Sequence, residues 1–132
     1  MDIEHLIRKG MERGASDIHL VGGLPPAFRV AGEILASEEE VLTEAGARDL
    51  IYGCLTQEHR AIFERDKQLC FSSVVEGVGH VRVSVYTRLG RVEASIRLRS
   101  FQIPTLEELG LPPSVAALTE KPNGLVLVTG PT

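Results

Sequence analysis

The chain has few aromatic residues, no tryptophan and no excess of basic residues. Aromatic residues make up 5% of its 132 positions, and its formal net charge is -4. Nucleic-acid-binding domains usually carry a basic surface, so this composition argues against nucleic acid as a partner. No apolar run reaches the length of a membrane span, and the first residues lack the basic start and apolar run of a signal peptide. These absences predict a cytoplasmic protein with no direct insertion into a membrane.

Metal-binding and nucleophilic motifs are also missing. Cys54 and Cys70 are isolated, and the histidines show no metal-ligand spacing, so we expect two reduced core thiols and no metal site. Asp17 and His19 share one face of a predicted strand. This pair either orients the histidine for proton transfer or forms a structural or interface contact. The acidic run Glu38-Glu39-Glu40 is interpreted as a solvated loop, and no self-contained active site is visible.

Hydrophobic residues make up 43% of the chain, which is enough for a core. Apolar residues at helical spacing predict a first helix over residues 3–11. Thr43 and Thr56 each precede a further helical pattern and are predicted N-caps. One face of the second helix carries Ala47, Leu50, Ile51 and Cys54. The third helix carries Ile62 and Phe63.

Alternation of polar and apolar residues predicts the strands. Short strands are expected at residues 16–20, 27–30 and 33–35, and a three-stranded antiparallel stretch follows from residue 69. In that stretch Leu69, Phe71, Ser73 and Val75 share one face, and the next two strands continue the alternation over residues 81–86 and 92–99. The fold class is therefore α+β, with an antiparallel sheet and flanking helices.

The character of the sequence changes near Pro104. Thr105-Leu106-Glu107-Glu108 has the capping-box pattern of a helix start, and a short helix is expected around Val115 and Leu118. The run Leu125–Val128 is apolar without alternation, as in a strand buried on both faces of an α/β sheet. The sequence thus predicts one domain over residues 1–103, and a linker with the start of a second, α/β domain over residues 104–132.

An arginine pair stands out in the antiparallel stretch. If Leu89-Gly90 forms a two-residue hairpin loop, Arg82 lies opposite Arg97 on the face away from the core. Like charges in this position repel each other, so either carboxylates from elsewhere in the fold or an external anion should offset them. Planar guanidinium groups suit bidentate phosphate recognition. The pair is a candidate anion site or, alternatively, part of a solvated face with acidic partners.

The chain stops at Gly130-Pro131-Thr132, directly after the predicted strand at 125–128. A phosphate loop reads G-x-x-x-x-G-K-[ST] after a strand, so these residues match only its beginning. Such a loop fragment has neither the phosphate lysine nor the magnesium hydroxyl.

Several segments together resemble the PilT family of twitching-motility (pilus-retraction) ATPases, within the wider type II/IV secretion ATPases. In order, these segments are GASDIHL at 14–20, GLPP at 23–26, RVAGE at 29–33, GHVRVSVY at 79–86, Arg97, IPTLEELGLP at 103–112 and GLVLVTGPT at 124–132.

The resemblance implies a PAS-like N-terminal domain over residues 1–103 and the first helix and strand elements of a RecA-like ATPase core over residues 104–132, ending within the phosphate loop. In that family the full-length protein hydrolyses ATP with Mg²⁺ in a homohexameric ring, peripheral to the inner-membrane pilus machinery. Arg82 and Arg97 match its phosphate-approaching arginines, and Gly130, Pro131 and Thr132 match the start of its phosphate loop. The N-terminal domain would have a regulatory and oligomerisation role, with no catalysis, bound nucleotide or metal expected from these residues alone.

Two alternatives stay open. A pilus-assembly or type II secretion ATPase shares these motifs, although such proteins usually carry a further domain ahead of the Ser16-Asp17-Ile18-His19 segment. A stand-alone PAS-like sensor or docking module would use the same N-terminal fold without an enzymatic role.

Overall fold

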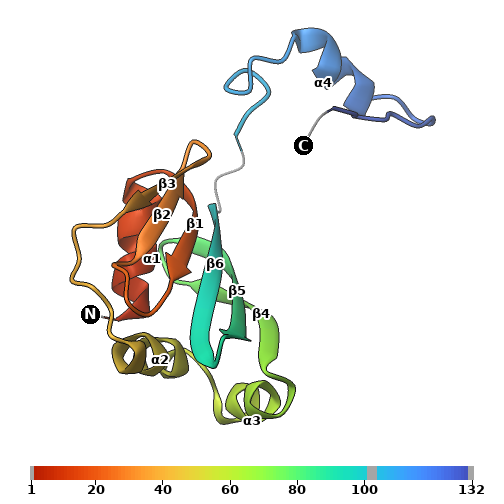
Figure 1. Cartoon of the computed structure of the whole chain (residues 1–132). Helices are drawn as coiled ribbons and strands as arrows, with labels where there is room; N and C mark the ends of the chain where they lie inside the picture. Colours follow the sequence, from red (N-terminus) through yellow and green to blue (C-terminus); the bar gives the residue numbers. More distant parts are fainter. Residues whose placement is uncertain (1, 101–103, 131–132) are drawn as a thin grey trace. The chain divides into compact units, whose positions relative to one another are not determined.

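A computed structural model describes residues 2–100 and 104–130. The chain divides into two units, residues 1–101 and residues 102–132 (Figure 1). The first unit contains a six-stranded antiparallel sheet in the order β3-β2-β1-β6-β5-β4. Its strands are β1 (Ala15–Leu20), β2 (Ala27–Val30), β3 (Glu33–Ala36), β4 (Gln68–Val75), β5 (Gly79–Arg88) and β6 (Arg91–Ser100).

Three helices accompany this sheet: α1 (Ile3–Glu12), α2 (Glu44–Gly53) and α3 (Gln57–Asp66). The two predicted threonine caps are confirmed. Thr43 Oγ1 accepts a hydrogen bond from the backbone nitrogen of Gly46 at 2.9 Å, and Thr56 Oγ1 accepts one from His59 at 3.1 Å. Each hydroxyl satisfies a donor that the first helical turn leaves unpaired. The predicted antiparallel sheet with flanking helices is thus present.

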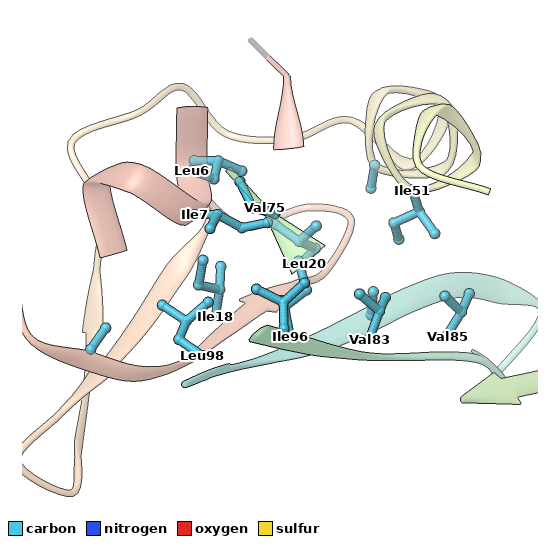
Figure 2. Packing of buried hydrophobic residues seen from close by; sticks show 14 of the residues in the cluster. Leu6, Ile7, Ile18, Leu20, Ile51, Val75, Val83, Val85, Ile96 and Leu98 are labelled. Atoms are coloured by element: carbon cyan, nitrogen blue, oxygen red, sulfur yellow. The ribbon is translucent and has the colours of Figure 1, made fainter. Parts of the chain in front are cut away.

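The core lies between the helices and one face of the sheet. Figure 2 shows Leu6 and Ile7 of α1 and Ile51 of α2 pointing toward the sheet residues Ile18 and Val83, and all five side chains are buried. Because side chains alternate along a strand, the intervening residues point to the opposite, polar face. That polar face carries the candidate site.

Gly10 lets α1 approach the sheet closely. A Cβ atom at this position would lie 3.0 Å from Leu98 Cδ1 and 3.2 Å from Ile18 Cδ1. Real Cβ contacts of this length require neighbouring atoms to move, so the helix position depends on the missing side chain.

The register of the β5–β6 hairpin is the predicted one. Arg88 pairs with Arg91, and Arg82 pairs with Arg97. Both residues of the connecting loop have positive φ, 50° at Leu89 and 79° at Gly90. A two-residue turn of this kind matches the right-handed twist of the flanking strands and therefore fixes their pairing.

The acidic loop after β3 is more than a solvated segment. Glu39 Oε1 lies 2.5 Å from Lys9 Nζ and 3.4 Å from His5 Nε2, and Glu38 Oε2 lies 3.6 Å from Arg13 Nη2. The predicted loop is present and its Glu38 and Glu40 are exposed, but Glu39 is partly buried against Lys9 and His5 of α1.

In the second unit, Thr105 and Glu108 form the predicted capping box. The Thr105 nitrogen donates to Glu108 Oε2 at 2.7 Å, and the Glu108 nitrogen donates to Thr105 Oγ1 at 3.2 Å. The segment makes only a turn, so the predicted helix here is not formed. The short helix expected around Val115 and Leu118 is present as α4 (Pro113–Thr119).

The strand predicted at Leu125–Val128 is also wrong for this structure. These four residues are exposed and have no regular secondary structure. A strand needs a neighbour to take its backbone hydrogen bonds, and the described residues of this unit contain none. Residues 104–130 thus contribute one helix and a capped turn, without the start of a parallel sheet.

Candidate functional site

The polar face of the sheet brings together four strands around the two arginines. Asp17 of β1 lies opposite Arg97 of β6, Arg97 lies opposite Arg82 of β5, and Cys70 of β4 lies opposite Ser84 of β5. These residues line a hollow of about 310 Å³, to which Ser95 also contributes. The hollow forms because each side chain occupies an outward position of its strand.

Arg97 is held by a carboxylate. Arg97 Nε donates to Asp17 Oδ1 at 3.1 Å. Asp17 Oδ2 accepts a hydrogen bond from Ser16 Oγ at 2.8 Å and lies 3.7 Å from Arg29 Nε. The Asp17 side chain is 12% exposed, whereas that of Arg97 is 59% exposed. Asp17 therefore anchors Arg97 at the edge of the hollow and leaves much of its guanidinium accessible.

These contacts make Asp17 more acidic than an ordinary aspartate. Burial raises its pKa, but hydrogen bonds from Ser16 and Arg97 and the positive charge of Arg97 outweigh burial and lower the pKa below the ordinary aspartate value. The carboxylate is thus ionised at neutral pH. The Asp17-His19 pair of the sequence analysis is only part of this arrangement, since the main partner of Asp17 is Arg97.

Arg82 has no carboxylate partner among the described residues. Its Nε donates to Cys70 Sγ at 3.3 Å, and Ser84 Oγ approaches the same sulfur at 3.5 Å. The other arginine pair of the hairpin is neutralised, since Arg88 binds Glu93 at 2.7 Å and Arg91 binds Glu44 at 2.7 Å. Arg82 is therefore a positive charge that the described part of the fold does not balance.

The prediction of two core thiols was wrong for Cys70. Cys54 is partly buried, but Cys70 is exposed on the polar face. Hydrogen bonds from Ser84 and Arg82 lower the pKa of the Cys70 thiol, whereas burial raises the pKa of Cys54. The alternation of Leu69 and Phe71 toward the core already implied that Cys70 faces outward.

The other predicted site residues, at the end of the chain, do not belong to the first unit. Gly130 belongs to the second unit, and Pro131 and Thr132 lie outside the described residues. Across residues 2–100 and 104–130, no group of three His, Cys, Asp or Glu side chains is arranged to hold a metal ion. No helix in that described part has the length and apolar character needed to cross a membrane.

In chemical terms, the hollow is a small polar recess with an excess of positive charge. It combines two guanidinium groups, two hydroxyl groups and one carboxylate, so its net charge is positive with the thiol neutral. Arginine forks match phosphate or carboxylate oxygens, and the serine hydroxyls can donate further hydrogen bonds. Of the two arginines that line the hollow, the carboxylate pairs with Arg97 and not with Arg82.

The comparison with known proteins is decisive for the family. The chain is 36% identical over all its 132 residues to the type IV pilus retraction ATPase PilT of Pseudomonas aeruginosa. The chain belongs to the PilT/PilU family of twitching-motility ATPases. It spans 38% of the length of that PilT and corresponds to the N-terminal part of the family's proteins. No protein-family model matches it.

A second relative and a solved structure agree with the PilT/PilU assignment. The type IV pilus ATPase PilU of Pseudomonas aeruginosa is 31% identical over all 132 residues of this chain. The aligned region is 35% of the PilU length. A crystal structure of the pilus retraction motor PilT with bound ADP superposes with a TM-score of 0.76 at 36% identity, covering 92% of this chain and 36% of that one. The six-stranded sheet and its helices thus match the N-terminal region of PilT.

Proposed function

We propose that this chain forms the N-terminal domain, with the first residues of the motor domain, of a hexameric ATPase that drives type IV pilus retraction. Similarity to PilT along the whole chain supports this role. The first unit would be the PAS-like regulatory and oligomerisation domain in a cytoplasmic ring at the inner-membrane pilus machinery. The 132 residues of the chain contain no Gly-Lys-Ser or Gly-Lys-Thr triplet, so we expect no ATP hydrolysis from them alone.

Arg82 and Arg97 would approach the phosphates of ATP from the N-terminal domain. The observation that carries this proposal is the direct pairing of Arg82 with Arg97 across β5 and β6. Arg97 has a carboxylate partner, Asp17, whereas Arg82 has no carboxylate partner among the described residues. ATP with Mg²⁺ supplies the transferable phosphoryl group, and Gly130, Pro131 and Thr132 would begin the loop that holds it. Arg82, whose charge is unbalanced, would make the main phosphate contact, and Arg97 would support it in a fixed orientation.

The test is ATP turnover by the full-length protein. Arg82→Ala should lower kcat about tenfold or more, because a preorganised cation that stabilises transition-state charge is lost. Arg97→Ala should lower kcat by a smaller factor. Circular dichroism and analytical ultracentrifugation would show whether each variant keeps its fold and its ring.

Arg99→Ala is the matched control. Arg99 also faces outward on β6 and has no carboxylate partner among the described residues, but it does not line the hollow. Its replacement should leave kcat unchanged. Equal turnover by wild type and Arg82→Ala in intact rings would refute the phosphate role, and equal loss in the Arg99 variant would reduce it to a general charge effect.

A further inference from the structure

A second hollow lies on the opposite, helix-bearing face of the sheet. It has a volume of about 700 Å³ and runs between α1, α2 and the strands β4 and β5. We call it the α1–α2 groove. It is lined by Asp2, Ile3, Glu4, Ile7, Gly46, Asp49, Leu50, Gly53, Cys54, Phe71, Ser73, Val74, Val75, Val81 and Val83.

The groove exists because the helices leave part of the sheet uncovered. Helix α1 packs on β1 and β6, α2 packs on β6, and α3 packs on β4. The floor between them is apolar, and Figure 2 shows three of its residues, Ile7, Val75 and Val83. Side chains at its edge, such as Val74, remain exposed. An apolar recess of this size accommodates a ligand or several partner side chains.

All charged residues that line the groove are acidic. They are Asp2, Glu4 and Asp49, and no lysine, arginine or histidine lines it. Asp2 is partly engaged, because its carboxylate accepts the His5 backbone hydrogen bond at the start of α1. Glu4 lies 3.8 Å from Arg8. Asp49 is exposed and has no ion pair or hydrogen bond within the described residues, so it is available to a cation from outside.

We propose that the α1–α2 groove docks a short amphipathic segment of a partner protein, with apolar side chains in the groove and a lysine or arginine against Asp49. Apolar grooves bind such segments through a few side-chain anchors, and flanking charges select among them. The acidic edge disfavours anionic segments and anionic lipid surfaces. This site is separate from the proposed phosphate contact, because it lies on the other face of the sheet.

Two variants test the groove itself. Gly53 ends α2 with an ordinary backbone conformation, and a Cβ atom there would have no neighbour within 4 Å. Gly53→Leu should therefore fold normally, and it adds a bulky apolar side chain at a position that lines the groove. Asp49→Asn removes the available carboxylate without breaking an internal ion pair. Glu33→Gln serves as the control. It removes one negative charge from the exposed strand β3, which is the edge strand opposite to β4 in the sheet.

The probes are two synthetic amphipathic peptides of fourteen residues, one of leucine and lysine and one of leucine and glutamate. Nuclear magnetic resonance titration of the 132-residue chain would locate binding. The lysine peptide should shift the amide signals of Leu50, Gly53, Cys54 and Val75. Asp49→Asn should weaken its binding about two- to fivefold, as expected for one exposed ion pair. Gly53→Leu should abolish it, and Glu33→Gln should leave it unchanged.

Several results would overturn the proposal. Equal binding of both peptides would remove the charge argument, and shifts confined to the polar face would place binding elsewhere. Retained affinity in a folded Gly53→Leu variant would show that the recess is not used. Dodecyltrimethylammonium binding at the same signals, without any peptide binding, would assign the groove to a small amphiphile instead of a protein segment.

Discussion

Arg97 and Asp17 lie directly opposite each other on neighbouring antiparallel strands, and Arg97 Nε donates to Asp17 Oδ1 at 3.1 Å. The two residues are 80 positions apart in the sequence. This contact offsets part of the repulsion between Arg97 and Arg82. It also distinguishes the two arginines, since one is anchored by a carboxylate and the other is not.

Replacing Asp17 should destabilise the first unit. Asp17→Asn removes the charge that Arg97 and Arg29 face, and we expect the free energy of unfolding to fall by about 1 kcal/mol, because the partners are partly solvated. Urea denaturation followed by circular dichroism measures this change. Asp49→Asn, which breaks no ion pair within the described residues, should stay within about 0.5 kcal/mol of wild type. Equal stability of the two variants would contradict the structural role of Asp17.

The same carboxylate predicts a dependence of stability on acid. Burial raises the pKa of Asp17, but the hydrogen bonds from Ser16 and Arg97 lower it by more. The pKa in the folded state is therefore below that in the unfolded state. The resulting stabilisation is present above the unfolded pKa, near 4, and is lost as the pH falls through the folded pKa. The urea midpoint of wild type should therefore drop more steeply below about pH 4 than that of Asp17→Asn. Parallel curves for the two proteins would show that Asp17 does not contribute.

The two cysteines should differ in reactivity. Hydrogen bonds from Ser84 and Arg82 lower the pKa of Cys70, which is exposed, and burial raises the pKa of Cys54. The thiolate is the reactive form, so iodoacetamide should modify Cys70 about tenfold faster than Cys54 or more at pH 7.5. Peptide mass spectrometry after timed alkylation gives both rates. In Arg82→Ala the pH profile of Cys70 should move to higher pH, and an unmoved profile would rule out the Arg82 contact as its cause.

Gly10 should be intolerant of a larger side chain. Gly10→Val places methyl groups where Leu98 and Ile18 already leave little space, and we expect a loss of about 2 kcal/mol of stability from overpacking. Gly53→Ala is the matched control, because its Cβ meets no atom within 4 Å and a helical glycine is replaced by a better helix former. Thermal unfolding of both variants compares the two sites. A stable Gly10→Val protein would show that α1 can move away from the sheet.

The β5–β6 hairpin shows how far local sequence determines the structure. Its two-residue loop fixes the register, so the pairing of Arg82 with Arg97 was predictable from the sequence. The threonine caps were predictable for a similar reason, since a cap and its acceptor lie within one helical turn.

The Asp17-Arg97 contact was not predictable in the same way. It depends on β1 lying beside β6, and strand order results from packing of distant segments that no local pattern encodes. The failed strand at Leu125–Val128 has the converse cause. Its apolar residues indicate strand neighbours, but none lies within the described residues of that unit.

The central position of β6 has a consequence for synthesis and folding. Strands β1–β3 pair with one another, and β4 pairs with β5; within residues 2–100, β6 alone joins these two groups into one sheet. It is also the last strand of the unit to leave the ribosome. The domain should therefore remain an open pair of half-sheets during translation and close cooperatively once residues 91–100 emerge, since non-local strand pairing must wait for its final partner.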